Sequence, residues 1–143
     1  MKWIVSLGVC VILGLLLAVN RPQAHHAFAA EFDASKKVTL KGVVVQMEWV
    51  NPHSWLTMDV LTQEGKSERW SLEFGPPNAL FRRGWRKSSL LSGMEISATG
   101  FLAKDGRNVA NADKVTLPDG TIFGAGAAGT GAPNDPDAAP VQK

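Results

Sequence analysis

The chain has 143 residues, of which 45% are hydrophobic and 20% are charged, and this is the composition of an ordinary folded protein. Its formal net charge of +2 comes from Lys2 and Arg21, so the rest of the chain carries equal numbers of basic and acidic residues. This balance excludes nucleic-acid binding driven by bulk charge, which needs a basic stripe to neutralise phosphates. The only cysteine, Cys10, lies in the amino-terminal segment, which excludes thiol chemistry and cysteine-based metal sites from residue 25 onward.

Residues 1–24 are typical of an export signal. Lys2 supplies a positive start, Trp3 to Val19 form an apolar run of 17 residues, and Ala24 is a small residue suited to a signal peptidase. We therefore expect cleavage after Ala24 and a periplasmic or secreted protein. An uncleaved signal that holds the chain on the membrane is the alternative, because about 17 apolar residues can just span a bilayer.

The remaining chain divides into three parts. We expect an amino-terminal arm over residues 25–37, one β-domain over residues 38–123 and a disordered Gly/Ala/Pro-rich tail over residues 124–143. The tail has too little apolar surface to offset the entropy of ordering it.

The first expected strand covers Val38 to Val50. Its apolar residues have even numbers before Gly42 and odd numbers after it, beginning with Val43. Such a change of face predicts a bulge or a sharp bend at this glycine. Asn51 and Pro52 then turn the chain.

The later elements follow a simple order. The second strand begins at His53 with Leu56, Met58 and Val60 on one face, and the third carries Trp70, Leu72 and Phe74 inward with Arg69, Ser71 and Glu73 outward. A short helix over residues 78–85 comes next, followed by strands through residues 94–102 and 110–117 and a closing segment at Ile122 and Phe123. Three strands, one helix and two strands predict an all-β, five-stranded, OB-fold-like barrel, and a small barrel with other connections is the alternative.

The histidines suggest a metal site. Cleavage after Ala24 makes His25 the amino terminus, where its α-amino group and imidazole can chelate one ion together, with His26 or His53 as a third nitrogen. Cu(II) suits such a nitrogen set. The alternatives are that the His25-His26 pair is a solvated terminus and that His53 only caps the turn at Asn51.

A second candidate site surrounds the same turn. Trp55 lies on the strand face opposite the apolar set, where it can stack on a flat ligand beside Asn51. The alternative is that Trp55 packs beneath the arm against Phe28 or Phe32. In both cases the arm and the turn are expected to be neighbours.

The third candidate is a basic cluster formed by Arg82, Arg83, Trp85, Arg86 and Lys87. On one helix, Arg82 pairs with Arg86 and Arg83 pairs with Lys87, which places cations near the helix carboxyl terminus and explains them structurally. Docking to an anionic lipid surface or to a protein partner is the functional alternative.

No spacing of residues predicts catalysis. The sequence has no nucleophile paired with a base, no phosphate-binding loop and no dinucleotide fingerprint, so we expect no enzyme. A small ligand or an envelope protein is the expected partner.

Several separated blocks resemble a family of small exported bacterial proteins known only as a domain of unknown function. These blocks are HHAFAAEFD from His25, EWVNPHSW, which contains Asn51, His53 and Trp55, PPNALFRRGW, which ends at Trp85, and the closing ANADKVTLPDG. The resemblance implies export and a compact β-domain. It implies no activity, ligand or catalytic residue.

Overall fold

The computed structural model describes residues 25–126 and contains six strands and two short helices in this range. The elements are α2 (His25–Glu31), β1 (Phe32–Glu48), β2 (Trp55–Leu61), β3 (Ser67–Glu73), α3 (Pro77–Arg82), β4 (Glu95–Ala103), β5 (Val109–Thr116) and β6 (Ile122–Gly124). The expected signal segment, residues 1–24, and residues 127–143 of the expected tail lie outside the described residues. No helix within residues 25–126 is long and apolar enough to cross a membrane.

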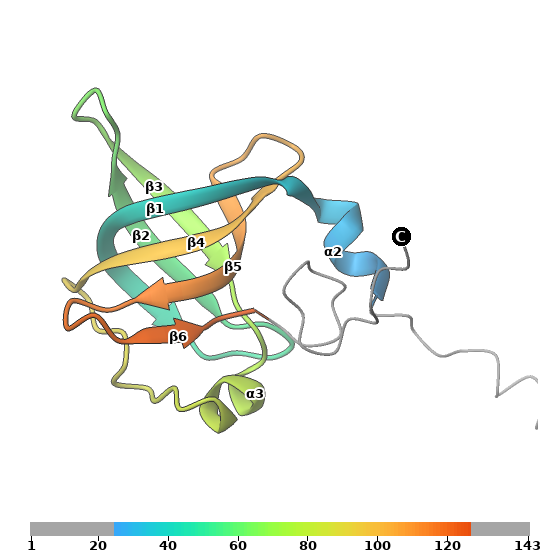
Figure 1. Cartoon of the computed structure of the whole chain (residues 1–143), viewed down its shortest axis with the longest axis vertical. Coiled ribbons are helices and arrows are strands. Elements are labelled where there is room, and N and C mark those ends of the chain that lie inside the picture. Colours follow the sequence, from blue (N-terminus) through green and yellow to red (C-terminus); the bar gives the residue numbers. More distant parts are fainter. Residues whose placement is uncertain (1–24, 127–143) are drawn as a thin grey trace, which may run out of the picture.

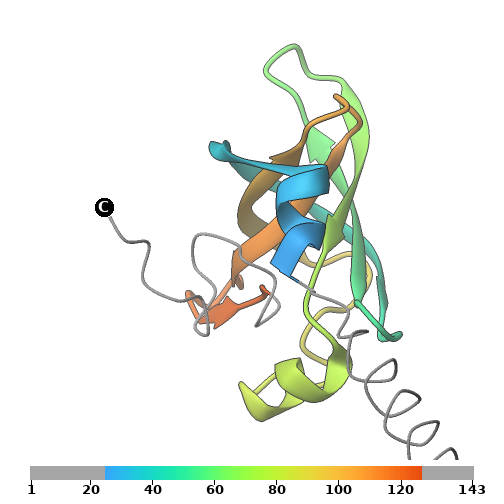
Figure 2. The same cartoon turned by 90° about the vertical axis from the view of Figure 1, so that its right-hand side faces the viewer.

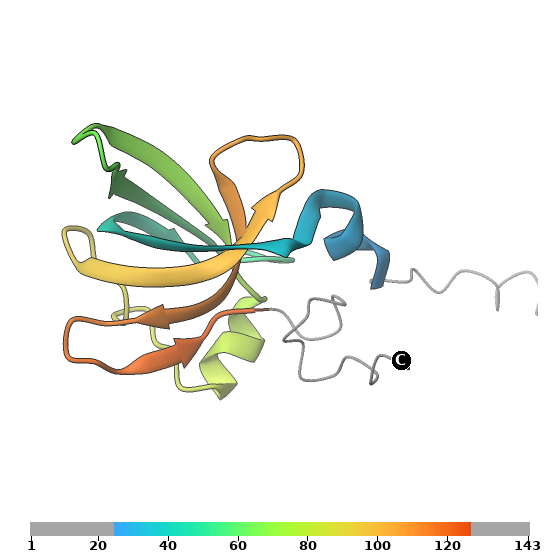
Figure 3. The ribbon, with the colours of Figure 1, turned by 45° about the horizontal axis from the view of Figure 1, so that its top comes forward.

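The strands form a hydrogen-bonded ring. β1 pairs with β2 on one side and with β4 on the other, both antiparallel, while β2 pairs with β3 and β4 pairs with β5. A short parallel pairing between β3 and the start of β5 closes the ring. The end of β5 pairs with β6 in antiparallel orientation (Figures 1 and 3). The predicted all-β, OB-fold-like architecture is confirmed, with β6 as a sixth strand and with two helices where the sequence predicted one.

The long strand β1 curves around the ring and passes from β4 to β2 at Gly42, where the sequence predicted a bulge or a sharp bend, but the bulge itself lies later in the strand. Leu40 and Val44 are both buried, so the inward face continues unchanged through Gly42, and Val43 is 37% exposed. The register shifts between Val44 and Gln46. Gly42 has another role, because a Cβ at this position would lie 2.1 Å from the carbonyl oxygen of Asp59 on β2. The glycine therefore permits the close approach of two backbones.

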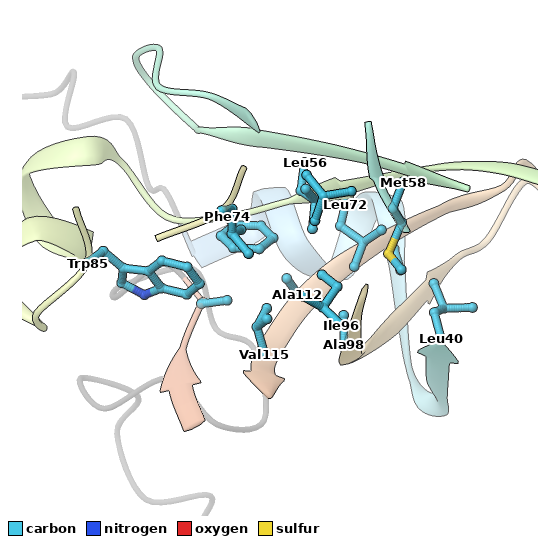
Figure 4. Close-up of a cluster of buried hydrophobic side chains, with 14 of the residues drawn as sticks. Leu40, Leu56, Met58, Leu72, Phe74, Trp85, Ile96, Ala98, Ala112 and Val115 are labelled. Atoms are coloured by element: carbon cyan, nitrogen blue, oxygen red, sulfur yellow. The ribbon is translucent and has the colours of Figure 1, made fainter. Parts of the chain in front are cut away.

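The core fills the inside of the ring. Alternating residues of β2 and β3 point inward as predicted, and they meet Ile96, Ala98, Ala112 and Val115 from β4 and β5 (Figure 4). Trp85, just after α3, covers one end of this core. It is fully buried, and its Nε1 donates a hydrogen bond of 2.8 Å to the carbonyl oxygen of Gly124.

Three predicted boundaries were wrong. The expected arm is α2 followed by residues 32–37 of β1, where Phe32 pairs with Ala103 on β4. The expected tail begins too early, because Ala125 is buried and is held by backbone hydrogen bonds from its own N–H and from Gly75. The second helix ends at Arg82 and not at residue 85, since the chain turns at Gly84 with a φ of +97°.

Candidate functional site

Helix α2 lies against one end of the ring (Figure 2). Aromatic packing holds it there. The ring of Phe28 lies 5.7 Å from that of Phe32 and meets the ring of Phe101 on β4 edge-on at 5.6 Å. The backbone N–H of Lys104 donates to the carbonyl oxygen of Glu31 at 2.9 Å, and the Lys104 ammonium donates to that of Ala29. The segment expected to be an arm therefore has a fixed place on the barrel.

Beside α2, the imidazole of His53 is paired with the carboxylate of Glu73. Nδ1 of His53 contacts Oε1 of Glu73. The hydrogen bond with Glu73 raises the pKa of His53 above its ordinary value of 6.5, burial opposes this rise, and the charges of Glu73 and Glu31 add to it. Glu73 was predicted to face outward into solvent, but it is only 6% exposed because His53 and the segment around α2 cover that face.

These groups line a cavity of about 170 Å³ between α2, the start of β2, the end of β3 and β5. Its lining residues are Phe28, Glu31, Phe32, His53, Trp55, Glu73 and Asn111. The expected proximity of the arm and the turn is confirmed, because both contribute to this lining. Trp55 is half-buried there and shares the cavity with Phe28 and Phe32.

Asn111 is the most unusual member of the lining. It lies on β5 opposite Glu73 in the parallel β3–β5 pairing, and only 4% of its surface is exposed. Its side-chain amide has no hydrogen-bond partner among the described residues, and it is not a fully buried group but reaches the accessible lining of the cavity. This amide is therefore available to a molecule in the cavity.

The predicted metal ligands are only partly located. His53 lines the cavity, while the side chains of His25 and His26 lie outside the described part of the structure. Within the described residues, no group of three or more His, Cys, Asp and Glu side chains is arranged to hold a metal ion.

The basic cluster does not join this cavity. Arg83 donates to the carbonyl oxygen of Gly126, and Arg86 donates to those of Phe81 and Trp85 at 3.2 and 2.7 Å. The predicted i and i+4 pairs are absent from the described structure because α3 ends at Arg82. Trp85, one of the residues suggested for ligand or partner binding, is instead a buried core residue.

The remaining predicted residue, Asn51, is exposed at the turn before β2, which contains a cis peptide bond to Pro52. It does not line the cavity.

A larger hollow of about 720 Å³ lies on the outside of the bend in β1. It is lined in part by Lys41, Asp59, Leu61 and Glu95, and it contains none of the predicted site residues. Its lining has no aromatic side chain, whereas the smaller cavity is lined by Phe28, Phe32 and Trp55. The smaller cavity is therefore the stronger candidate site.

Sequence reasoning missed three polar residues of this cavity, Glu31, Glu73 and Asn111. Asn111 alternates with Ala110 and Ala112 in a strand whose residues are buried on both faces, and a polar residue in such a run is a usable signal. Glu73 has no comparable local signal.

The comparisons with known proteins agree with the resemblance seen in the sequence. A family model described as a family of unknown function (DUF6152) matches residues 14–112. No curated protein matches the chain. The matched range includes every lining residue of the cavity. Because the match covers more than half of the chain, the protein belongs to this family of unknown function.

Proposed function

We propose that the protein is an exported binding module without enzymatic activity and that its ligand site is the cavity beneath α2. The apolar run at residues 3–19 supports export. The observation that carries the ligand site is the Asn111 amide, which lines a cavity with aromatic walls and has no hydrogen-bond partner among the described residues, so both its donors and its acceptor are open to a ligand.

The size of the cavity limits the ligand. An engineered cavity of about 150 Å³ holds a benzene molecule, so a cavity of similar volume suits one ring with a small substituent. Phe28, Phe32 and Trp55 supply apolar walls, while Asn111, His53 and Glu73 supply hydrogen-bonding groups. Such a combination is typical of small-molecule sites.

Three single-ring probes test the site independently of ligand charge: benzylamine, benzyl alcohol and benzoate. We expect at least one of them to shift the NMR signals of the Asn111 side-chain amide and the Trp55 indole N–H in a saturable titration. The variant Asn111→Leu should abolish this response, and Asn108→Leu, at an exposed position three residues earlier, should retain it. Failure of all three probes to shift these signals would overturn the proposal.

Cu(II) is the second candidate ligand. Glu73 contacts Nδ1 of His53, which leaves Nε2 for a metal ion, and metal-bound histidines commonly have such a carboxylate partner. Helix α2 begins at His25 and its seven residues span only about 10 Å, so we consider His25 or His26 as further ligands.

Native mass spectrometry of protein purified from its export compartment tests the copper site. A chain that starts at His25, retains one copper after stoichiometric Cu(II) and loses it in both His25→Ala and His53→Ala would support it. If the His53→Ala variant still retains copper, the metal ion is not bound in the cavity.

A protein partner is the third candidate, through Trp55 and the cluster Arg82–Lys87. Within this cluster, Arg82 and Lys87 are exposed and their side chains make no hydrogen bond or ion pair with other described residues, whereas Arg83 and Arg86 do. Replacing both with Gln should weaken such an interaction and leave binding of the single-ring probes unchanged.

A further inference from the structure

We propose that the cavity beneath α2 selects a small organic cation, namely a single apolar ring that carries an ammonium or amidinium group. This inference rests on the proposed binding function and adds the charge and the chemical class of the ligand.

The first observation is the charge of the lining. Glu31 and Glu73 contribute carboxylates, and no lysine or arginine side chain lines the cavity. Two cations lie nearby but do not line the cavity: Arg107 pairs closely with Asp105 and reaches Glu31 only at 3.5 Å, and the Lys104 ammonium donates to a carbonyl oxygen of α2. His53 compensates Glu73 only while it is protonated.

The second observation is the acceptor chemistry at the buried end of the cavity. Asn111 lies opposite Glu73 across the β3–β5 pairing, so an amide oxygen and a carboxylate come from neighbouring strands. An ammonium or amidinium group carries several N–H donors and no acceptor, and it can satisfy both oxygens at once. An anionic group would meet the carboxylates of Glu31 and Glu73 with like charge, and His53, the one lining residue that can carry a positive charge, is already paired with Glu73.

The third observation is the aromatic wall. Phe28, Phe32 and Trp55 line the same 170 Å³ cavity. A cation beside aromatic faces is attracted by their negative electrostatic potential, most strongly by that of tryptophan. The apolar body of the ligand packs against the same rings. Acidic, amide and aromatic groups thus favour the same class of ligand.

The ranking of the three single-ring probes at neutral pH tests the class. They share a benzene ring and differ in charge, so their dissociation constants isolate the contribution of the ligand's charge. We expect benzylamine to bind about tenfold more tightly than benzyl alcohol, which corresponds to about 1.4 kcal/mol, and benzoate to bind more weakly than both.

Charge-neutralising variants sharpen the test. Glu31→Gln should reduce the preference for benzylamine over benzyl alcohol several-fold, because it removes one lining carboxylate. The matched control Glu68→Gln removes an exposed carboxylate of β3 that does not line the cavity, and it should leave the preference unchanged.

The outcomes separate the two proposals. Equal or tighter binding of benzyl alcohol or benzoate, with the Asn111 and Trp55 signals still responding, would overturn the cationic class and retain the binding site. An unchanged preference in Glu31→Gln would also overturn it. Failure of every probe to bind would overturn the proposed function itself.

Discussion

The pair formed by His53 and Glu73 is expected to stabilise the fold, and His53→Ala measures how much. The substitution leaves the Glu73 carboxylate, whose side chain is only 8% exposed, without its partner. A hydrogen bond to a charged group contributes about 1.5–3 kcal/mol, and the 29% exposure of the His53 side chain favours the lower half of this range. We therefore expect a loss of about 2 kcal/mol in the free energy of unfolding.

Urea and thermal unfolding followed by circular dichroism provide the assay. For a domain of this size, about 2 kcal/mol corresponds to a fall of roughly 10 °C in Tm. Adding Glu73→Gln to the His53→Ala variant should recover part of the loss, because the buried charge is then removed as well. A change within about 0.5 kcal/mol in His53→Ala, or a further loss in the double variant, would refute the stabilising role of the pair.

The same pair predicts a pH dependence of stability. The pKa of His53 is higher in the folded chain than its ordinary value of 6.5, mainly because of the hydrogen bond with Glu73. The folded state therefore binds this proton more tightly than the unfolded state does. The resulting stabilisation is fully present below pH 6.5 and is lost as the pH rises through the folded-state pKa. The difference in unfolding free energy between the wild type and His53→Ala should shrink over that rise; a constant or growing difference contradicts the prediction.

Two further predictions concern the fold. Gly42→Ala should lower the free energy of unfolding by several kcal/mol or prevent folding, because the new Cβ would lie 2.1 Å from the Asp59 carbonyl oxygen. The control Gly124→Ala places its Cβ in open space, so its Tm should be nearly unchanged in the same thermal assay. Arg83→Ala should lower the free energy of unfolding by about 1 kcal/mol, because it removes the hydrogen bond to the carbonyl oxygen of residue 126. Arg82→Ala, at an exposed position, should change this free energy by less than about 0.5 kcal/mol. Equal effects of the two variants in urea unfolding would contradict the prediction.

The fold was largely predictable because the signal is local. Leu56, Met58 and Val60 alternate with polar residues, and this period of two directly reflects which side chains face the core. The bulge in β1 was placed too early because the sequence shows only that the apolar parity changes. The structure shows that Gly42 is needed for the approach of β2 and that the register shifts later, after Val44.

The candidate site was predictable only in part because its residues meet through long-range pairing. His53 and Trp55 stood out within one short motif, and their proximity to the amino-terminal segment was expected. Glu73 and Asn111, however, lie opposite each other only because β3 and β5 pair in parallel. No local sequence pattern predicts a pairing between segments so far apart in the sequence. The docking of α2 depends likewise on Phe101, which is contributed by a distant strand.

The side-chain amide of Asn111 gives the most direct test of the proposed site. In a titration of the protein with benzylamine followed by NMR, we expect saturable shifts of this amide and of the Trp55 indole N–H, and we expect Asn111→Leu to abolish the binding. Shifts confined to residues outside the cavity lining, or no saturable shift at all, would contradict it.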